Sequence, residues 1–290
     1  MLTFGQIAAV TCRNLPSGFG GVKLRRANFA PMPRPGQPPL NIGQRGHADS
    51  LENTLISFRE SIAMGAQMVE LDVRLSKDGV PMVCHDRTIQ RISGRRGVIA
   101  DLTAKRLTSV DLGNGFRIPT LEAVLAELTP RIPVNVELKF DKPEYRPLAT
   151  AVCAVIANLG VTPRILISSF FHPSLVIAQR LLPEVSVAPL FGCLTGPPHD
   201  DDLSPLFAGP RRNDSPQVYP FAGPAAVVWN KMIDSDLAQR FSEAGATLLT
   251  YTVDEPEEMR RLIELGIDGI ITNRPAVLQG VLQDLFPYGP

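Results

Sequence analysis

From about residue 41 onward, the chain alternates between two kinds of apolar pattern. Short apolar runs, typical of buried strands, are separated by segments in which apolar residues recur every three or four positions, as on one face of a helix. Nine runs are candidate strands: 41–45, 67–75, 80–85, 133–139, 164–170, 185–191, 225–229, 247–253 and 269–272. The candidate helices cover 54–64, 120–128, 148–159, 174–182, 234–244 and 255–265. Repeated strand–helix units predict a parallel sheet covered by helices.

One connection in this series is too short to hold a helix. Lys77-Asp78-Gly79 separates two candidate strands, and Asp-Gly is a strong hairpin signal. Because parallel neighbours need a crossover of roughly a dozen residues, we expect the strand at 80–85 to return antiparallel. Removing it from the nine leaves eight, the number that closes a barrel. We therefore predict an α/β fold of the (β/α)₈ TIM-barrel type.

Length and composition agree with one such barrel. The chain has 290 residues, of which 44% are hydrophobic, and its basic and acidic residues balance at 29 each. This balance argues against a nucleic-acid partner, and no apolar run reaches the roughly 18 residues of a transmembrane segment. The cysteines, Cys12, Cys84, Cys153 and Cys193, are too widely spaced for a zinc ribbon or a disulfide scaffold. Such cysteine usage suits a reducing compartment, and we expect a cytoplasmic protein.

Two segments fall outside the barrel pattern. Residues 1–40 contain five basic residues and no acid, and they end in a Pro-rich run. Since proline cannot extend a helix or a strand ladder, we predict a basic N-terminal arm (1–40) before a barrel domain (41–285). Acid-free leaders also occur as organelle transit peptides, which leaves an organellar location as the alternative. The Gly- and Pro-rich stretch 192–224 is predicted to be a loop insertion at the rim of the barrel.

Acidic residues recur at candidate strand ends. Glu70 and Asp72 are two positions apart on one candidate strand, and Glu137 lies on the next parallel one. Because alternate residues of a strand point to the same face, these carboxylates should converge at the carboxyl end of the barrel, where barrel enzymes keep their chemistry. Oxygen ligands without a thiolate are what a hard divalent cation prefers. The pattern predicts a site for Mg²⁺ or Ca²⁺.

Basic and titratable residues follow the same strand ends. Arg45, Lys139 and His85 each close a candidate strand, next to the expected carboxylates. Cationic side chains beside a metal site suit an anionic, phosphate-bearing substrate. Each feature alone is more typical of a salt-bridged strand or a turn, and only their recurrence at successive strand ends favours a functional site.

The order and spacing of these motifs resemble the glycerophosphodiester phosphodiesterases over about residues 41 to 280. The matching stretches are Gln44-Arg-Gly46, Leu51-Glu-Asn-Thr54, Val69-Glu-Leu-Asp-Val73, 77–86, Ile118-Pro-Thr-Leu-Glu122, Asn135-Val-Glu-Leu-Lys139, Ile167-Ser-Ser-Phe170, Tyr251-Thr-Val-Asp254 and 266–275. The resemblance implies a barrel of the phospholipase C-like phosphodiesterase type.

The resemblance also implies roles for individual residues. The metal would be held by Glu70, Asp72 and Glu137, and the phosphate by Arg45 and Lys139. His85 would protonate the leaving alcohol. Glu52 would support the metal site, although it could equally be an N-terminal carboxylate of the helix at 54–64.

The sequence departs from the family at the first catalytic histidine, which is Gln44 here. Glutamine has no titratable proton near pH 7, so it can position a phosphate oxygen or water but cannot transfer a proton. His47 either takes over this role or is a loop residue that points elsewhere. Tyr251, which would line the substrate's alcohol side, and Asp254 replace the family's tryptophan and asparagine.

The resemblance implies metal-dependent hydrolysis of glycerophosphodiesters to glycerol phosphate and an alcohol, within glycerol and lipid metabolism. The partner would be a small-molecule glycerophosphodiester or a lysophospholipid head group. Loss of the first histidine keeps two other functions open. One is a non-catalytic barrel that binds phosphodiesters, and the other is a relative with altered phosphotransfer chemistry.

Overall fold

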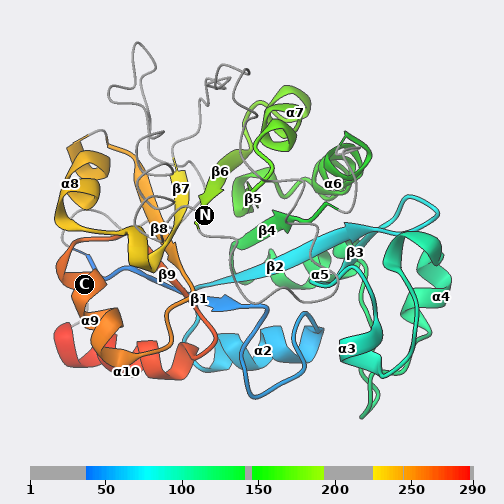
Figure 1. Ribbon diagram of the computed structural model, residues 1–290, viewed down its shortest axis with the longest axis horizontal. Coiled ribbons are helices and arrows are strands. Elements are labelled where there is room, and N and C mark those ends of the chain that lie inside the picture. The colour runs from blue at the N-terminus through cyan, green and yellow to red at the C-terminus, as the bar shows by residue number, and fades with distance from the viewer. Residues whose placement is uncertain (1–36, 141–145, 193–224, 244, 288–290) are drawn as a thin grey trace, which may run out of the picture.

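The computed structural model describes residues 37–287, apart from 141–145, 193–224 and 244. Within these residues, eight parallel strands close into a barrel, because β1 pairs with both β9 and β2 (Figure 1). The strands are β1 (Leu40–Gln44), β2 (Met68–Leu75), β4 (Val134–Leu138), β5 (Ile165–Ser169), β6 (Ser186–Phe191), β7 (Ala225–Trp229), β8 (Thr247–Tyr251) and β9 (Gly269–Thr272). The predicted (β/α)₈ barrel is confirmed.

The predicted hairpin is also present. β3 (Pro81–Val83) runs antiparallel to β2, with Val73 opposite Val83 and Leu75 opposite Pro81. Gly79 occupies the turn with a φ of 80°, a conformation that glycine adopts without steric cost. Strand β2 therefore extends past the barrel, and β3 returns along it to the rim.

Helices cover the outside of the barrel. They are α2 (Leu55–Ala63), α5 (Leu121–Leu128), α6 (Arg146–Leu159), α7 (Pro173–Leu181), α8 (Ser235–Glu243), α9 (Pro256–Glu264) and α10 (Pro275–Leu285). Six of these match predicted helices, whereas α10 was not predicted. Threonine side chains cap α2 and α5, where Thr54 and Thr120 accept hydrogen bonds from backbone N–H groups of the first turn.

The core has two layers, separated by the strands. Residues such as Ile42, Met68 and Leu166 fill the barrel interior, whereas Val69, Leu71 and Val73 pack outward against helices. This alternation along β2 turns Glu70 and Asp72 inward. Both strand faces are buried, as expected when helices cover a closed parallel sheet.

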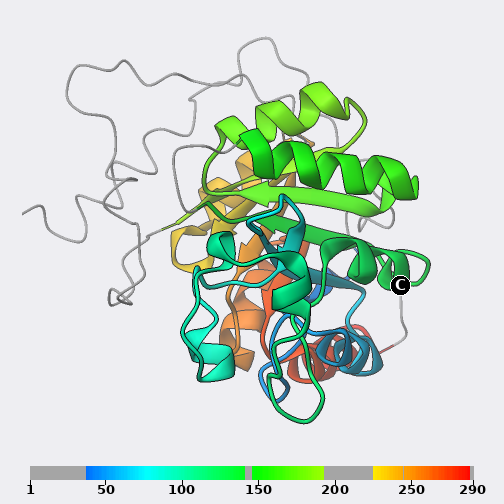
Figure 2. The ribbon, with the colours of Figure 1, turned by 90° about the vertical axis from the view of Figure 1, so that its right-hand side faces the viewer.

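The segment between β3 and α5 forms a small lobe at one side of the barrel. It contains α3 (Gln90–Ser93), the 3₁₀ turn η1 (Ile99–Asp101) and α4 (Ala104–Thr108), none of which was predicted. Its apolar side chains form a separate cluster that includes Ile89 and Leu107. The lobe lies at the right in Figure 1 and faces the viewer in Figure 2.

The predicted basic arm and the predicted insertion lie almost entirely outside the described residues. The first described residue is Gln37, and 193–224 are not described. Among the described helices, none has the length and apolar character needed to cross a bilayer.

Candidate active site

The three predicted acidic residues converge at the carboxyl ends of β2 and β4. Strand register places Asp72 beside Glu137, and Glu70 lies two positions before Asp72. One carboxylate oxygen from each residue lies within 4.8 Å of the others, and all three side chains are buried. In the part of the chain that the structure describes, this is the one such cluster of potential metal ligands.

Asp72 is the most fully compensated of these acids. Its Oδ2 lies 3.0 Å from Arg45 Nε, and its Oδ1 lies 3.2 Å from Lys139 Nζ. Although burial opposes its charge, Lys139 and Arg45 hold the pKa of Asp72 far below its usual range. Lys139 also contacts Glu137 Oε1 at 2.5 Å, so this lysine joins the two strands.

Glu70 has the opposite electrostatic environment. Burial and the charges of Asp72 and Glu137 raise the pKa of Glu70 well above its ordinary value. Its Oε2 accepts a hydrogen bond from the Arg45 backbone N–H at 3.2 Å, and no cationic side chain of the described residues forms an ion pair with it. A divalent cation beside Glu70 would supply the missing positive charge, so the donor set fits a hard metal ion.

Asn53 positions Asp72, a role that the sequence analysis missed. Its Nδ2 donates to Asp72 Oδ2 at 2.9 Å, and its Oδ1 accepts from the Asp72 backbone N–H at 3.3 Å. Asn53 and Arg45 both have positive φ values, 57° and 49°, which bend the 45–54 loop over the carboxylates. The signal was present in Leu51-Glu-Asn-Thr54, a stretch recognised as a motif but given no role at this residue.

His85 lies at the end of the returning strand and belongs to a chain of charged contacts. Its Nδ1 lies 2.7 Å from Asp86 Oδ1, and Arg91 Nε donates to Asp86 Oδ2 at 2.6 Å. Arg91 also binds both carboxylate oxygens of Glu52, which in turn lies 3.5 Å from Arg45 Nη1. Burial lowers the pKa of His85.

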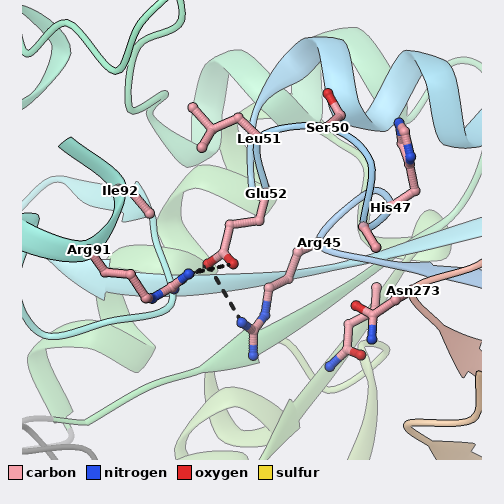
Figure 3. Close-up of a pocket in the computed structure, with 10 residues that line it drawn as sticks. Arg45, His47, Ser50, Leu51, Glu52, Arg91, Ile92 and Asn273 are labelled. Carbon is pink, nitrogen blue, oxygen red and sulfur yellow. Dashed lines mark hydrogen bonds and ion pairs between the residues drawn. The ribbon is translucent and has the colours of Figure 1, made fainter. Parts of the chain in front are cut away.

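The structure excludes one of the two interpretations of Glu52. The N-cap of α2 is Thr54, whose side chain accepts from the Ser57 N–H, so the capping interpretation of Glu52 is wrong. Glu52 instead faces Arg91 and Arg45 in a pocket of about 270 Å³ (Figure 3). Gln44, Arg45, His47, Ala48, Ser50, Leu51, Glu52, Arg91, Ile92 and Asn273 line this pocket.

Gln44 ends β1 and His47 follows it, and the two side chains have different partners. Gln44 Oε1 accepts a hydrogen bond at 2.7 Å from Oγ1 of Thr252, the residue that follows β8. His47 Nε2 lies 2.9 Å from Glu60 Oε2 on α2, and its Nδ1 accepts from the Asp49 N–H. In Figure 3 the His47 ring points toward α2 and away from Arg45. The ring of His47 is therefore held by Glu60 on α2 and not by the cluster of Glu70, Asp72 and Glu137.

The two replacements at the end of β8 have distinct surroundings. Tyr251 packs edge-on against Phe170, with 6.0 Å between ring centres, and its hydroxyl donates to the Phe191 carbonyl. Asp254 accepts hydrogen bonds from Thr272 and from both the backbone and side-chain nitrogens of Asn273. Asp254 thus fixes the chain that follows β9, next to the pocket.

The fold and the site together define a class of protein. A closed α/β barrel places buried acids beside an arginine and a lysine at the carboxyl ends of its strands, an arrangement that could hold a divalent cation and an anionic group. Comparison with known families gives the narrower identity. Residues 42–277 match the model of the glycerophosphoryl diester phosphodiesterase family, and the chain belongs to this family of phosphoric diester hydrolases.

Individual relatives agree with this assignment. A glycerophosphodiester phosphodiesterase from Caldanaerobacter subterraneus is 31% identical over 248 residues, covering 82% of this chain and 96% of the relative. One from Bacillus altitudinis is 30% identical and covers 77% of this chain and 89% of the relative. The resemblance stated from the sequence is confirmed.

Solved structures of the family have the same barrel. The glycerophosphodiester phosphodiesterase of Parabacteroides distasonis superposes with a TM-score of 0.69 at 25% identity, covering 86% of this chain and 99% of that one. An Oleispira antarctica phosphodiesterase, solved with its product sn-glycerol-3-phosphate, shares the fold with a TM-score of 0.69 at 23% identity. It covers 85% of this chain and 97% of that one.

Proposed function

We propose that this chain hydrolyses glycerophosphodiesters to glycerol phosphate and an alcohol, using Mg²⁺ or Ca²⁺ held by Glu70, Asp72 and Glu137. The observation that carries the proposal is the buried carboxylate cluster flanked by Arg45 and Lys139. A divalent cation at such a cluster supplies positive charge to the phosphoryl oxygens. The glycerol-containing substrate is supported by the names of the relatives.

The side chains around the cluster divide the remaining work. Arg45 and Lys139 bind the phosphate, since both are held at the edge of the carboxylates. As water attacks phosphorus and the bond to the alcohol breaks, protonated His85 gives its Nε2 proton to the leaving oxygen. The proton of the attacking water passes to solvent, because Gln44 cannot accept it. Tyr251, packed on Phe170, lines the alcohol side.

Gln44 is proposed to slow this reaction rather than abolish binding. With Oε1 occupied by Thr252, its amide nitrogen is left to orient a phosphoryl oxygen or water. Loss of one general acid–base group typically lowers the rate by about 10²–10⁴-fold. His47 is assigned a structural role, because Glu60 and the Asp49 N–H engage both of its ring nitrogens.

The same residue favours one alternative, a barrel that binds phosphodiesters without turning them over. Phosphorus NMR of the protein with glycerophosphocholine and added Mg²⁺ or Ca²⁺ separates the cases. Appearance of glycerol phosphate that a chelator suppresses supports the hydrolase, whereas transfer of the phosphoryl group to an added alcohol indicates altered phosphotransfer. No turnover, together with metal-dependent thermal stabilisation by glycerol phosphate, indicates the binding barrel. The absence of both turnover and stabilisation would overturn the proposal.

A further inference from the structure

Arg91, on the short helix α3 of the side lobe, joins two carboxylates from separate parts of the chain. Its Nε donates to Asp86 Oδ2 at 2.6 Å, and its Nη1 and Nη2 donate to Glu52 Oε2 and Oε1 at 2.9 and 2.7 Å. Figure 3 shows the guanidinium reaching Glu52 across the pocket. The planar fork of arginine matches a carboxylate with two parallel hydrogen bonds, which a lysine cannot do.

The two carboxylates contact two different residues of the active site. Asp86 Oδ1 lies 2.7 Å from His85 Nδ1, on the side of the proton donor. Glu52 Oε1 lies 3.5 Å from Arg45 Nη1, on the side of the phosphate-binding arginine. Arg91 is thus the common partner of both sides.

Packing fixes the short helix that carries Arg91, although the Arg91 side chain itself is half-exposed. Ile89, at the N-cap of α3, is buried in the apolar cluster of the side lobe. The Ile89 N–H also donates to the Gly97 carbonyl, and Arg74 Nε donates to the His85 carbonyl at 2.6 Å. An isolated surface ion pair contributes little, but a network anchored on packed segments has fixed geometry. The network therefore has the means to orient a side chain.

We propose that Arg91 is a positioning residue for the proton transfer. By fixing Asp86, it keeps the Nδ1–H of His85 on that carboxylate, so that Nε2 is the nitrogen offered to the substrate. When the bond from phosphorus to the alcohol breaks, the Nε2 proton moves to the leaving oxygen, and neutral His85 retains its Nδ1–H on Asp86. This inference rests on the hydrolase function proposed above.

The proposal is tested by comparing the turnover of substrates with different leaving groups. An alkyl alcohol such as choline needs a proton to depart, whereas an aryl leaving group departs as a phenolate. Arg91→Met and Asp86→Asn should each lower turnover of glycerophosphocholine by about 10- to 100-fold, as expected for residues that orient a functional side chain, with little change for an aryl phosphodiester. Arg91→Lys should recover only part of the loss. Arg95→Met, at an exposed arginine two residues after α3, is the matched control and should behave like wild type.

Nitrogen NMR of the histidine rings tests the same point without turnover. In the wild type, His85, assigned with a His85→Gln variant, should carry its proton on Nδ1, and Arg91→Met should give a mixture of tautomers. The proposal requires both the selective rate loss and this spectral change. Equal losses for both substrates, or identical His85 spectra in Arg91→Met and Arg95→Met, overturn it. If wild type turns over neither substrate, the rates are measured in a Gln44→His background. If that variant is also silent, the hydrolase proposal fails and takes the role of Arg91 in proton transfer with it, whereas the spectra still show whether Arg91 fixes the tautomer of His85.

Discussion

Two strands of this protein, β1 of the barrel and the returning strand β3, are each followed by a histidine that contacts a carboxylate, yet the two pairs have different surroundings. After β1, His47 is almost completely buried, and its ring contacts Glu60 on the outer helix α2. After β3, about a third of the His85 side chain is exposed, and its ring contacts Asp86 beside the active site. Both are histidine–carboxylate pairs, but His47–Glu60 joins a loop to a helix, whereas His85–Asp86 lies beside the carboxylate cluster.

The difference lies in the second ring nitrogen. Both nitrogens of His47 are occupied, because Nδ1 accepts from the Asp49 N–H while Nε2 contacts Glu60. At His85 the described contacts occupy Nδ1 alone. A histidine can serve as a proton donor only when one nitrogen remains for the substrate. Proton transfer is therefore expected from the β3 end, while the β1 end offers only the amide of Gln44.

The largest effect should come from making the two strand ends alike. Gln44→His should raise the rate of glycerophosphocholine hydrolysis by about 10²–10⁴-fold, because it adds a second acid–base group at the barrel mouth. Steady-state release of glycerol phosphate measures this gain. Gln44→Asn, which keeps an amide, is the control and should show none. A histidine variant no faster than wild type would remove Gln44 from the explanation of a low rate.

A comparable loss should follow from removing the β3 histidine. In the Gln44→His background, His85→Gln should lower the turnover of glycerophosphocholine by about 10²–10⁴-fold. His47→Gln, in the same background, should leave turnover close to that of its parent. If the His47 variant lost as much as the His85 variant, the contrast between the two strand ends would be wrong.

Most of the barrel could be predicted because its signals are local. Apolar periodicity located the strands, and Asp78-Gly79 identified the hairpin that makes the strand count close. The α10 pattern was equally local, with Leu278, Val281 and Leu282 on one buried face, and it was overlooked. The side lobe gave no such signal, because α3 has only four residues and cannot show a helical period.

The site was predictable only as far as strand alternation reaches. Glu70, Asp72 and Glu137 converge because alternate residues of paired strands share a face. The partners of His47 and Glu52 depend instead on a loop bent by positive φ at Arg45 and Asn53. Nothing in the local sequence states that a residue on α3 will bind Glu52, 39 positions earlier. Such contacts are properties of the folded chain.

Metal binding should not depend on either histidine, because the expected ligands Glu70, Asp72 and Glu137 lie on β2 and β4. Ca²⁺ or Mg²⁺ at 100 times its dissociation constant should stabilise the fold by about 2.7 kcal/mol by mass action, seen as a higher melting temperature. Glu70→Gln should abolish this response. Because the pKa of Glu70 is raised in the folded state, the folded protein favours the protonated carboxyl, and this contribution to stability is lost as the pH rises through that pKa. At neutral pH and without metal, Glu70→Gln should therefore melt at a higher temperature than wild type. A lower melting temperature for the metal-free variant, or a metal response that persists in it, would contradict the assigned site.

The smallest effect should come from His47, and it should be one of stability. His47→Ala removes a buried ring that joins the 46–50 loop to α2 and leaves the Asp49 N–H without its acceptor. This should lower the free energy of unfolding by about 1–3 kcal/mol, which corresponds to roughly 2–4 °C in melting temperature for each kcal/mol. Glu60→Gln keeps a hydrogen-bond acceptor for Nε2 and should melt closer to wild type.

Below the melting transition, the turnover of the His47 variant, measured in the Gln44→His background, should match its parent, because His85 and the carboxylate cluster are unchanged. A variant of normal stability that has lost turnover would show that His47, despite its position against α2, reaches the substrate during the reaction.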